Sequence, residues 1–256
     1  MMLALILKDL RLYTNNQKYW IIQFAILFFF VFIFFVSMME FYAQGTTMQL
    51  NRVPIDVGRQ TYELFIICIF IVQFLVPRQA VEAVYMERSL TFFKDHQQGD
   101  SENLVMLALT PLSNWKILLG KLAAVVIWAL WSVWFAIPLF ALSSYIGGLA
   151  ISQLVRCGVV ILVSCIFFAL VGIGVALWNS PTRAKGFSYG FILVITFLPL
   201  IPISPFTDIP IFVILSPLCA ILSILQSNVT HLWIWNVCLF CVLCLLIFPI
   251  LCRRVS

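Results

Sequence analysis

Six stretches of apolar residues, each long enough to form a helix across a lipid bilayer, recur along the chain. Such a helix needs about 20 residues, because it rises about 1.5 Å per residue and must cross roughly 30 Å of hydrocarbon. The stretches are 19–39, 61–86, 117–142, 152–178, 187–203 and 231–252. With 63% hydrophobic and only 10% charged residues, the chain has too little polar surface for a soluble globular protein or a soluble enzyme. The sequence predicts an all-α polytopic membrane protein with one transmembrane domain over residues 1–256.

The distribution of basic residues predicts the orientation of the chain. Most Lys and Arg residues precede the first stretch, lie between or beside the second and third, separate the fourth and fifth, or follow the sixth. These residues are Lys8, Arg11, Lys18, Arg88, Lys94, Lys116, Lys121, Arg183, Lys185, Arg253 and Arg254. The opposite loops hold only Arg52, Arg59 and Arg156. Because cytoplasmic loops carry an excess of Lys and Arg, both termini are expected in the cytoplasm. In a membrane protein basic residues mostly reflect this orientation, so the net charge of +5 is not taken to indicate a nucleic-acid partner.

Residues 1–18 carry a polar stripe. Lys8, Arg11, Asn15 and Lys18 follow one another at spacings of three, four and three residues, on a helix otherwise rich in Leu and Ile. This pattern predicts a helix that lies in the cytoplasmic membrane interface. The alternative is one long tilted helix that continues into the first span.

Prolines crowd the segment between the fifth and sixth stretches. They are Pro199, Pro202, Pro205, Pro210 and Pro217. Proline removes a helical hydrogen bond and clashes with the preceding turn, so no straight helix is expected there. Residues 209–226 are nevertheless strongly apolar. We therefore predict that 204–230 is a re-entrant segment in the outer half of the membrane, which needs surrounding protein to satisfy its backbone.

One polar pair lies inside the apolar stretches. Arg78 and Glu82 are four residues apart on one helical face just after Pro77, so their side chains can pair. The pair is either a polar contact in a translocation path or at a subunit seam, or an arginine that extends to the interface and is neutralised by its neighbour. The two histidines, His96 and His231, belong to no metal or nucleophile motif, so no catalytic residue, metal or cofactor is expected in this chain.

The cytoplasmic loop 87–116 joins the second and third spans. Asp100 or Ser101 can cap a short helix over the apolar run 104–109, and Pro111 ends this helix. A helix held at both ends by spans is a mechanical handle, because a partner that presses on it moves both spans. The alternative is an ordinary amphipathic helix that lies on the lipid.

The residues after this helix resemble the signature of ABC-2 type transporter permeases. They are Leu109-Thr110-Pro111-Leu112-Ser113 followed by Ile117-Leu118-Leu119-Gly120-Lys121. Further matches occur in the expected order along nearly the whole chain. They are Lys8-Asp9-Leu10-Arg11, Gly58-Arg59-Gln60, Pro77, Glu87-Arg88, Thr182-Arg183-Ala184-Lys185 with Ser188-Tyr189, and Leu215-Ser216-Pro217. The chain departs from the family before the loop helix, where it carries additional residues and has Glu102-Asn103 in place of Gly-Thr.

The resemblance implies the six-span permease subunit of an ATP-driven exporter, in which the loop helix is a coupling helix. ATP and Mg would bind in a separate ABC ATP-binding subunit, because Gly120-Lys121 lacks the flanking residues of a phosphate-binding loop. A second permease copy or a paralogue would complete a dimer in the plasma membrane, typically the bacterial inner membrane. Six residues on the loop helix and at its exit are the expected ATPase contacts: Glu102, Asn103, Leu104, Met106, Leu107 and Trp115. The substrate is left open.

Four alternatives are weighed against this one. A haem-exporter-like permease of cytochrome c maturation is related, but that family is usually shorter and has a different acidic stretch. A secondary transporter is expected to show internal repeats or intramembrane carboxylates for ion coupling, and neither is evident. A membrane scaffold would have no use for the coupling loop. A membrane-embedded transferase or hydrolase needs reactive residues at one membrane depth, whereas the acidic residues here scatter across loops.

Overall fold

The chain is described from a computed structural model in which every described element is an α-helix. The described residues are 2–15, 17–45, 54–92, 114–134, 137–138, 141, 151–178, 181–197, 210–225 and 231–255. The helices are α1 (Met2–Asn15), α2 (Gln17–Gly45), α3 (Pro54–Gln73), α4 (Leu75–Phe92), α6 (Asn114–Trp134), α8 (Ile151–Trp178), α9 (Pro181–Phe197), α10 (Pro210–Leu215), α11 (Pro217–Leu225) and α12 (Leu232–Val255).

Within the described residues, five segments are long and apolar enough to cross a membrane, which confirms the prediction of an all-α membrane protein. The segments are Tyr19–Val36, Tyr62–Tyr85, Trp115–Trp134, Ile151–Trp178 and Leu232–Arg253. Each falls on one of the predicted stretches. The remaining stretch, 187–203, begins in α9, which has 17 residues, and ends outside the described residues. Its crossing of the membrane stays a prediction.

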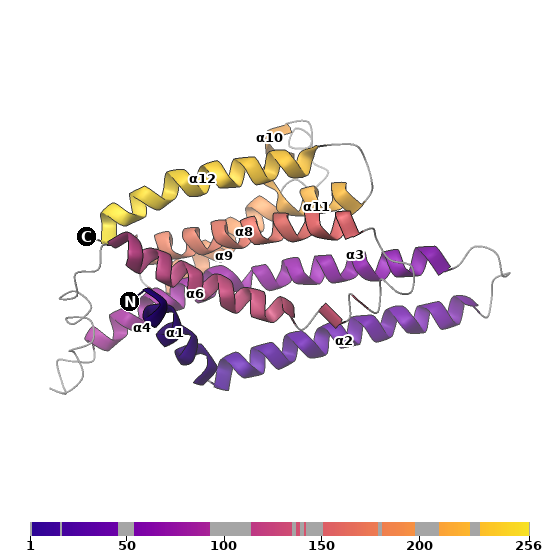
Figure 1. Cartoon of the computed structure of the whole chain (residues 1–256), viewed down its shortest axis with the longest axis horizontal. Helices are drawn as coiled ribbons and strands as arrows, with labels where there is room; N and C mark the ends of the chain where they lie inside the picture. The colour runs from indigo at the N-terminus through magenta and orange to yellow at the C-terminus, as the bar shows by residue number, and fades with distance from the viewer. Residues whose placement is uncertain are drawn as a thin grey trace.

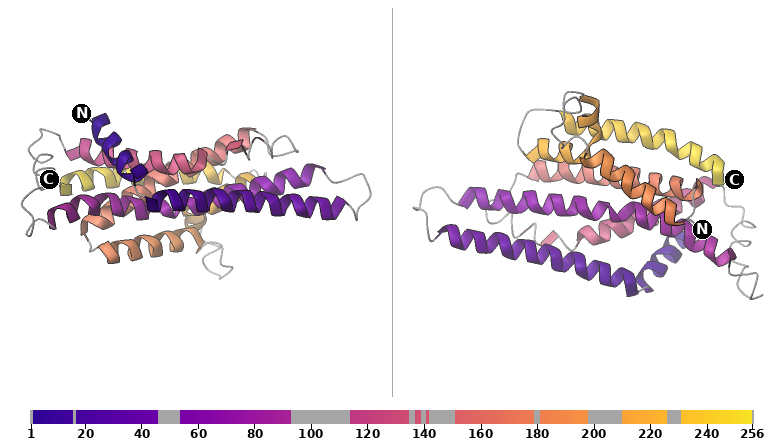
Figure 2. Two further views of the ribbon diagram at one scale, coloured as in Figure 1. Left: turned by 90° about the horizontal axis from the view of Figure 1, so that it is seen from below. Right: turned by 180° about the vertical axis from the view of Figure 1, so that it is seen from behind.

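Helix α8 forms the centre of the bundle (Figures 1 and 2). Its apolar segment is 72% buried, whereas those of α2 and α12 are 17% buried because these two helices lie at the periphery. Helices α4, α9, α11 and α12 pack against α8. Large apolar side chains such as Phe28 on α2 and Leu245 on α12 stay exposed, as suits helices surrounded by lipid.

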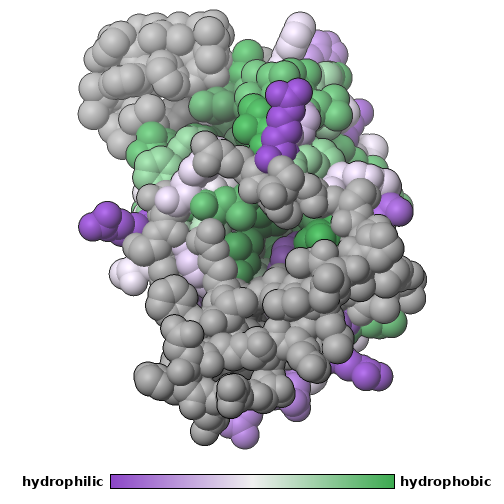
Figure 3. Space-filling view, turned by 90° about the vertical axis from the view of Figure 1, so that its left-hand side faces the viewer, coloured by the Kyte–Doolittle hydropathy of each residue, from purple (hydrophilic) through white to green (hydrophobic). Residues whose placement is uncertain are grey.

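Both termini lie at one end of the bundle, here called the termini end (Figure 1). The last turns of α4 and α12 and the first turns of α6 and α9 lie at the same end. Figure 3 looks onto the termini end, where hydrophilic side chains project around the rim beside apolar surfaces. At the opposite end, the Arg156 guanidinium lies 5.6 Å from the centroid of the Trp233 ring.

The predicted stretch 61–86 is divided into two helices. Helix α3 ends at Gln73 and α4 begins at Leu75, and the backbone N–H of Phe74 donates to the Ile71 carbonyl over 3.0 Å. Pro77 accounts for the division, because it has no N–H to donate to the Gln73 carbonyl and its ring clashes with that group.

Gly172 of α8 lies directly against this division. A Cβ atom at Gly172 would lie 2.7 Å from the Pro77 carbonyl oxygen and 2.9 Å from the Ala80 Cβ atom. Only glycine fits at this distance. The two most extensively packed helices, α4 and α8, thus approach each other through small residues, as is common for helix pairs in membranes.

The N-terminal helix is separate from the first span. Helix α1 ends at Asn15, α2 begins at Gln17, and the two meet at a steep angle (Figures 1 and 2). The last carbonyls of a helix have no partner within it. Here the Trp20 indole N–H donates to the Thr14 carbonyl over 2.7 Å, which joins the two helices across the turn. The alternative of one continuous helix is therefore wrong, while the interfacial location of α1 stays a prediction.

The proline-rich segment contains two short helices, α10 and α11, divided at Ser216. The Ser216 hydroxyl donates to the Thr196 carbonyl over 2.9 Å and accepts from the Cys219 N–H over 3.4 Å. The Asn236 side-chain amide donates to the Ile214 carbonyl over 2.6 Å. The α12 side chain of Asn236 therefore satisfies a backbone carbonyl at the break, and Ser216 ties the break to a carbonyl of α9. The depth of this segment in a membrane stays a prediction.

Two predicted loops are shorter than expected. Residues 182–185 form the first turn of α9, because Pro181 suits the first position of a helix and these residues follow it. The loop 87–116 is shortened at both sides, since α4 continues to Phe92 and α6 begins at Asn114.

Candidate functional site

The candidate site is a cluster of four polar side chains at the termini end, here called the Glu82 cluster: Tyr19, Arg78, Glu82 and Lys185. Glu82 Oε1 accepts from Lys185 Nζ over 2.7 Å and from Arg78 Nε over 3.2 Å. Glu82 Oε2 accepts from the Tyr19 hydroxyl over 3.0 Å. The contact between Arg78 and Glu82 joins residues four apart on one helix, which is the spacing from which the sequence predicts that they can pair.

The four residues come from three helices that are distant in the sequence. Tyr19 begins the span of α2, Arg78 and Glu82 lie one turn apart on α4, and Lys185 lies in the first turns of α9. The Glu82 side chain is 21% exposed, whereas those of Lys185 and Arg78 are 35% and 44% exposed. One half-buried carboxylate therefore holds two cations that still reach solvent or lipid headgroups, and it joins α2, α4 and α9.

The electrostatic balance of the cluster is positive. Two cations share one carboxylate, and the Tyr189 hydroxyl, one turn after Lys185, also interacts with Arg78. Charged groups near hydrocarbon are costly unless they are paired, which explains why these groups converge. The arrangement can hold helices together and attract an anion. The described residues contain no group of three or more His, Cys, Asp or Glu side chains that could hold a metal ion.

A second polar contact lies beside the cluster. Lys121 on α6 is buried, with 7% exposure, and its Nζ atom donates to the Ala83 carbonyl on α4 over 3.0 Å. The Tyr85 hydroxyl donates to the Ala176 carbonyl on α8 over 3.1 Å. These contacts attach α6 and α8 to the two turns of α4 that also carry Glu82.

Sequence reasoning found Arg78 and Glu82 but missed Tyr19, Lys121 and Lys185 as members of this region. For Lys121 a signal was present: a lysine inside an apolar run at the start of a span must find an acceptor. Tyr19 and Lys185 lie 63 and 103 residues from Glu82, and no local pattern indicates such contacts.

Most of the expected ATPase contacts fall outside the described residues. They are Glu102, Asn103, Leu104, Met106 and Leu107. Trp115 is described: it lies in the first turn of α6, is 47% exposed, and its ring centroid lies 5.5 Å from the Lys116 ammonium. The two helices that flank the predicted loop, α4 and α6, finish and start at the termini end (Figure 1).

Comparison of the chain with protein-family models and with curated proteins gives no match.

Proposed function

We propose that this chain is the permease subunit of an ATP-driven exporter of the ABC-2 type. The support is the ordered set of motif matches along the sequence, together with a helical membrane bundle whose termini lie at one end. ATP hydrolysis belongs to a separate ATP-binding subunit with its own Mg, and a second permease copy or a paralogue completes the transporter. The cytoplasm faces the termini end, where most basic residues gather.

Six membrane crossings are part of this proposal. A chain with both ends on one side of a membrane crosses it an even number of times, and five long spans alone would leave the termini on opposite sides. Helix α9 starts at the termini end and runs back along α8 and α4 (Figure 2). Its 17 residues, continued over the following apolar residues, supply the sixth crossing.

The observation that carries the proposal is the contact between Lys121 and the Ala83 carbonyl. Lys121 is the last residue of the segment Ile117–Lys121, which matches the permease signature, and Ala83 lies on the other helix that flanks the loop. A permease must convert a push on its coupling helix into movement of spans. Because Lys121 ties α6 to the middle of α4, a push on the loop would move both helices as one unit.

The cluster around Glu82 extends this unit. Glu82 lies one residue before Ala83 and binds Tyr19 on α2 and Lys185 on α9. Closure of the ATPase pair would therefore shift α4 and α6 directly, and α2 and α9 through the carboxylate. In this mechanism the ion pairs are a linkage between helices, and no covalent chemistry occurs in the chain.

The test is a pull-down of the tagged chain from its native membrane in mild detergent, with mass spectrometry of the copurifying proteins. We expect an ATP-binding subunit to copurify with the native chain. The double variant Leu104→Asp, Leu107→Asp should lose it, because two carboxylates would disrupt an apolar contact. Trp115→Ala should weaken recovery, since Trp115 is the exposed residue at the exit of the loop.

The control is Leu50→Asp, which makes the same type of substitution once, in the segment expected on the opposite face, and is compared with Leu104→Asp and Leu107→Asp made singly as well as together. It should leave recovery of the ATPase unchanged. Loss of the ATPase with Leu50→Asp as well would mean that the effect is unspecific. Absence of any ATP-binding subunit from an intact native complex would reject the proposal and direct attention to gradient-driven transport or a scaffold role.

A further inference from the structure

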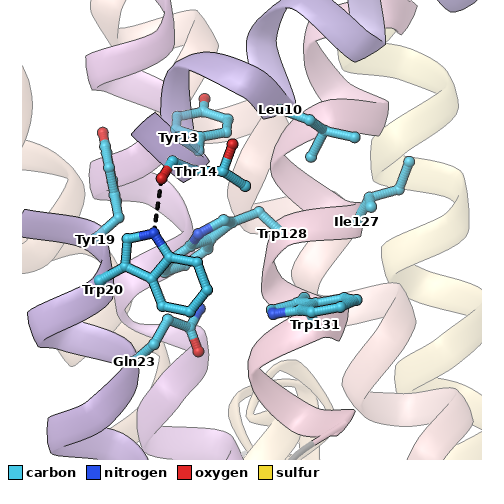
Figure 4. A pocket seen from close by; sticks show the side chains of 9 residues that line it. All are labelled: Leu10, Tyr13, Thr14, Tyr19, Trp20, Gln23, Ile127, Trp128 and Trp131. Atoms are coloured by element: carbon cyan, nitrogen blue, oxygen red, sulfur yellow. Dashed lines mark hydrogen bonds between the residues drawn. The ribbon is translucent and has the colours of Figure 1, made fainter. Parts of the chain in front are cut away.

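A cavity of about 300 Å³ lies in the angle between α1, α2 and α6 (Figure 4). This elbow pocket, as we call it, is at the termini end, where the first span begins. Its lining residues are Leu10, Tyr13, Thr14, Tyr19, Trp20, Gln23, Ile127, Trp128 and Trp131. Five of these nine side chains are aromatic. The volume is at the lower limit for small-molecule sites, which suits one hydrocarbon chain rather than a whole lipid.

The wall of the elbow pocket is built from packed aromatic rings. Tyr13 meets Tyr19 edge-on with ring centroids 5.1 Å apart, and Tyr19 meets Trp128 with centroids 6.0 Å apart. The hydrogen bond from Trp20 to the Thr14 carbonyl fixes α1 over the pocket, as the dashed line in Figure 4 shows. The pocket is thus a feature of the angle between the two helices and does not depend on a chance rotamer.

Most polar groups of the lining are engaged within the protein, although the buried Gln23 Oε1 atom has no hydrogen-bond partner among the described residues. Gln23 is buried, with 7% exposure, and its Nε2 atom donates to the Ser132 hydroxyl over 2.7 Å. The Trp20 N–H is used by Thr14. The surface offered to a ligand is therefore hydrocarbon and aromatic ring, which a sugar or nucleotide could not use. An alkyl chain gains from burial there.

The pocket opens toward the outer surface of the bundle. Trp20, Ile127 and Trp131 are 44%, 42% and 55% exposed, and they lie on the outer faces of two spans. A membrane lipid reaches such an opening sideways from the bilayer. Tryptophan also concentrates at the level of the lipid headgroups, which is the expected depth of residues at the start of a first span.

Two basic residues lie on α1, the helix that contributes Leu10, Tyr13 and Thr14 to the pocket. Arg11 on α1 is exposed, follows the lining residue Leu10, and lies one turn before Thr14. Half-buried Lys8 is one turn earlier on the same helix. These side chains are placed to meet a phosphate at the membrane surface while the hydrocarbon lies below it.

We propose that the elbow pocket binds one acyl chain of an anionic phospholipid from the leaflet at the termini end, with the phosphate beside Arg11. This goes beyond the exporter function and requires only that the chain is embedded in a membrane. Bound lipid would fill the angle between α1 and α2 and stabilise it. The Tyr19 ring would contact the lipid, while the Tyr19 hydroxyl keeps its hydrogen bond to Glu82.

The test uses the purified full chain in nanodiscs of phosphatidylglycerol that contain a small fraction of the same lipid with a diazirine on its acyl chain. Light-induced labels are located by peptide mass spectrometry. We expect labels on α6 around Ile127 to Trp131 and on α1 around Leu10 to Thr14. Increasing amounts of unmodified phosphatidylglycerol should compete with the probe, so that labelling of these peptides falls along a saturable curve. Labelling of the outer face of α2 around Phe28 should show no such saturation.

A variant that fills the pocket supplies the matched comparison. Ile127→Trp should lower labelling of the pocket peptides about tenfold. Leu130→Trp adds the same bulk to the same helix at a residue that is 40% exposed but does not line the pocket, so labelling should be unchanged. Equal labelling of the pocket peptides in both variants would overturn the proposal. So would a constant ratio of pocket to outer-face labelling at every lipid ratio, because that is the behaviour of ordinary boundary lipid.

The headgroup is tested by exchange of phosphatidylglycerol for phosphatidylcholine. Labelling should fall about fivefold in the native chain, which corresponds to about 1 kcal/mol for one basic residue near an anionic surface. Arg11→Gln should abolish this difference, whereas Arg183→Gln, which removes an exposed charge from α9 at the same end, should keep it. If the native chain is labelled equally in both lipids, an anionic lipid is rejected as the ligand. A cross-link between two copies of the chain would assign the pocket to a protein partner instead.

Discussion

Glu82 binds three side chains at once, so its two oxygens have different structural roles. Oε1 joins α4 to α9 through Lys185 and is also shared with Arg78 on its own helix, whereas Oε2 joins α4 to α2 through Tyr19. Bonds between charged partners are shorter and stronger than neutral ones, and the 2.7 Å contact with Lys185 is the shortest of the three. The link between α4 and α9 is therefore the one most sensitive to substitution.

Lys185→Met should lower the unfolding free energy by about 1 kcal/mol, because Glu82 loses its closest partner while the partly exposed site lets other groups replace part of the interaction. Arg183→Met, two residues earlier on the same helix, removes an exposed charge and should have no measurable effect. Thermal unfolding in mild detergent compares the two. Equal melting temperatures for both variants would show that the ion pair contributes nothing to the bundle.

Spacing alone predicts the contact between Arg78 and Glu82, since residues four apart are neighbours on a helix. The rest of the cluster could not be predicted in this way. Tyr19 at the start of an apolar run and Lys185 in a short basic segment look like ordinary interface residues. Their convergence on one carboxylate results from the packing of α9 against α4 and from the reach of the Tyr19 hydroxyl to α4, which a single sequence does not encode in any local pattern.

At the scale of elements, α4 and α8 approach each other closely at Gly172. Without a hydrophobic driving force between helices in lipid, such an approach depends on the fit of small residues. The Pro77 carbonyl and the Ala80 methyl group fill the space that a side chain at Gly172 would need. Gly158, on the same helix, has no atom within 4 Å of its Cβ position.

Gly172→Ala should therefore lower the unfolding free energy by about 1–3 kcal/mol, because a methyl group would overpack a contact made with backbone. Gly158→Ala should be neutral or slightly stabilising, since alanine favours a helix by up to about 1 kcal/mol over glycine. Thermal unfolding of the two purified variants gives the comparison. A Gly172→Ala protein as stable as Gly158→Ala would mean that α4 and α8 can separate at this point without cost.

The apolar runs predict the positions of the spans well, because a run of this length has few other ways to be buried. Element boundaries are predicted less well. Pro77 indicates a disturbed helix, yet the division lies at Phe74, since proline acts on the turn that precedes it. The start of α9 at Pro181 was missed because its basic first turn has the composition of a loop.

At the scale of the whole molecule, the position of the two termini constrains the number of crossings. Reporter fusions can count them: a fluorescent protein that folds only in the cytoplasm, placed after Arg254 and after Ser180, should give signal. The same reporter after Ser204, beyond α9, should give none, whereas a periplasmic phosphatase reporter there should be active. Equal cytoplasmic signal after Ser180 and Ser204 would show that α9 does not cross, and the six-span arrangement would be wrong.

The break at Ser216 has a consequence for the synthesis of this protein. The Ser216 hydroxyl binds Thr196, which has already left the ribosome, but the Ile214 carbonyl receives its hydrogen bond from Asn236, which is made 22 residues later. An open carbonyl is expensive in lipid. If this segment enters the membrane as predicted, we expect α10 and α11 to stay with the insertion machinery until the final helix emerges. A chain truncated before Asn236 would then present an unfinished segment to membrane proteases.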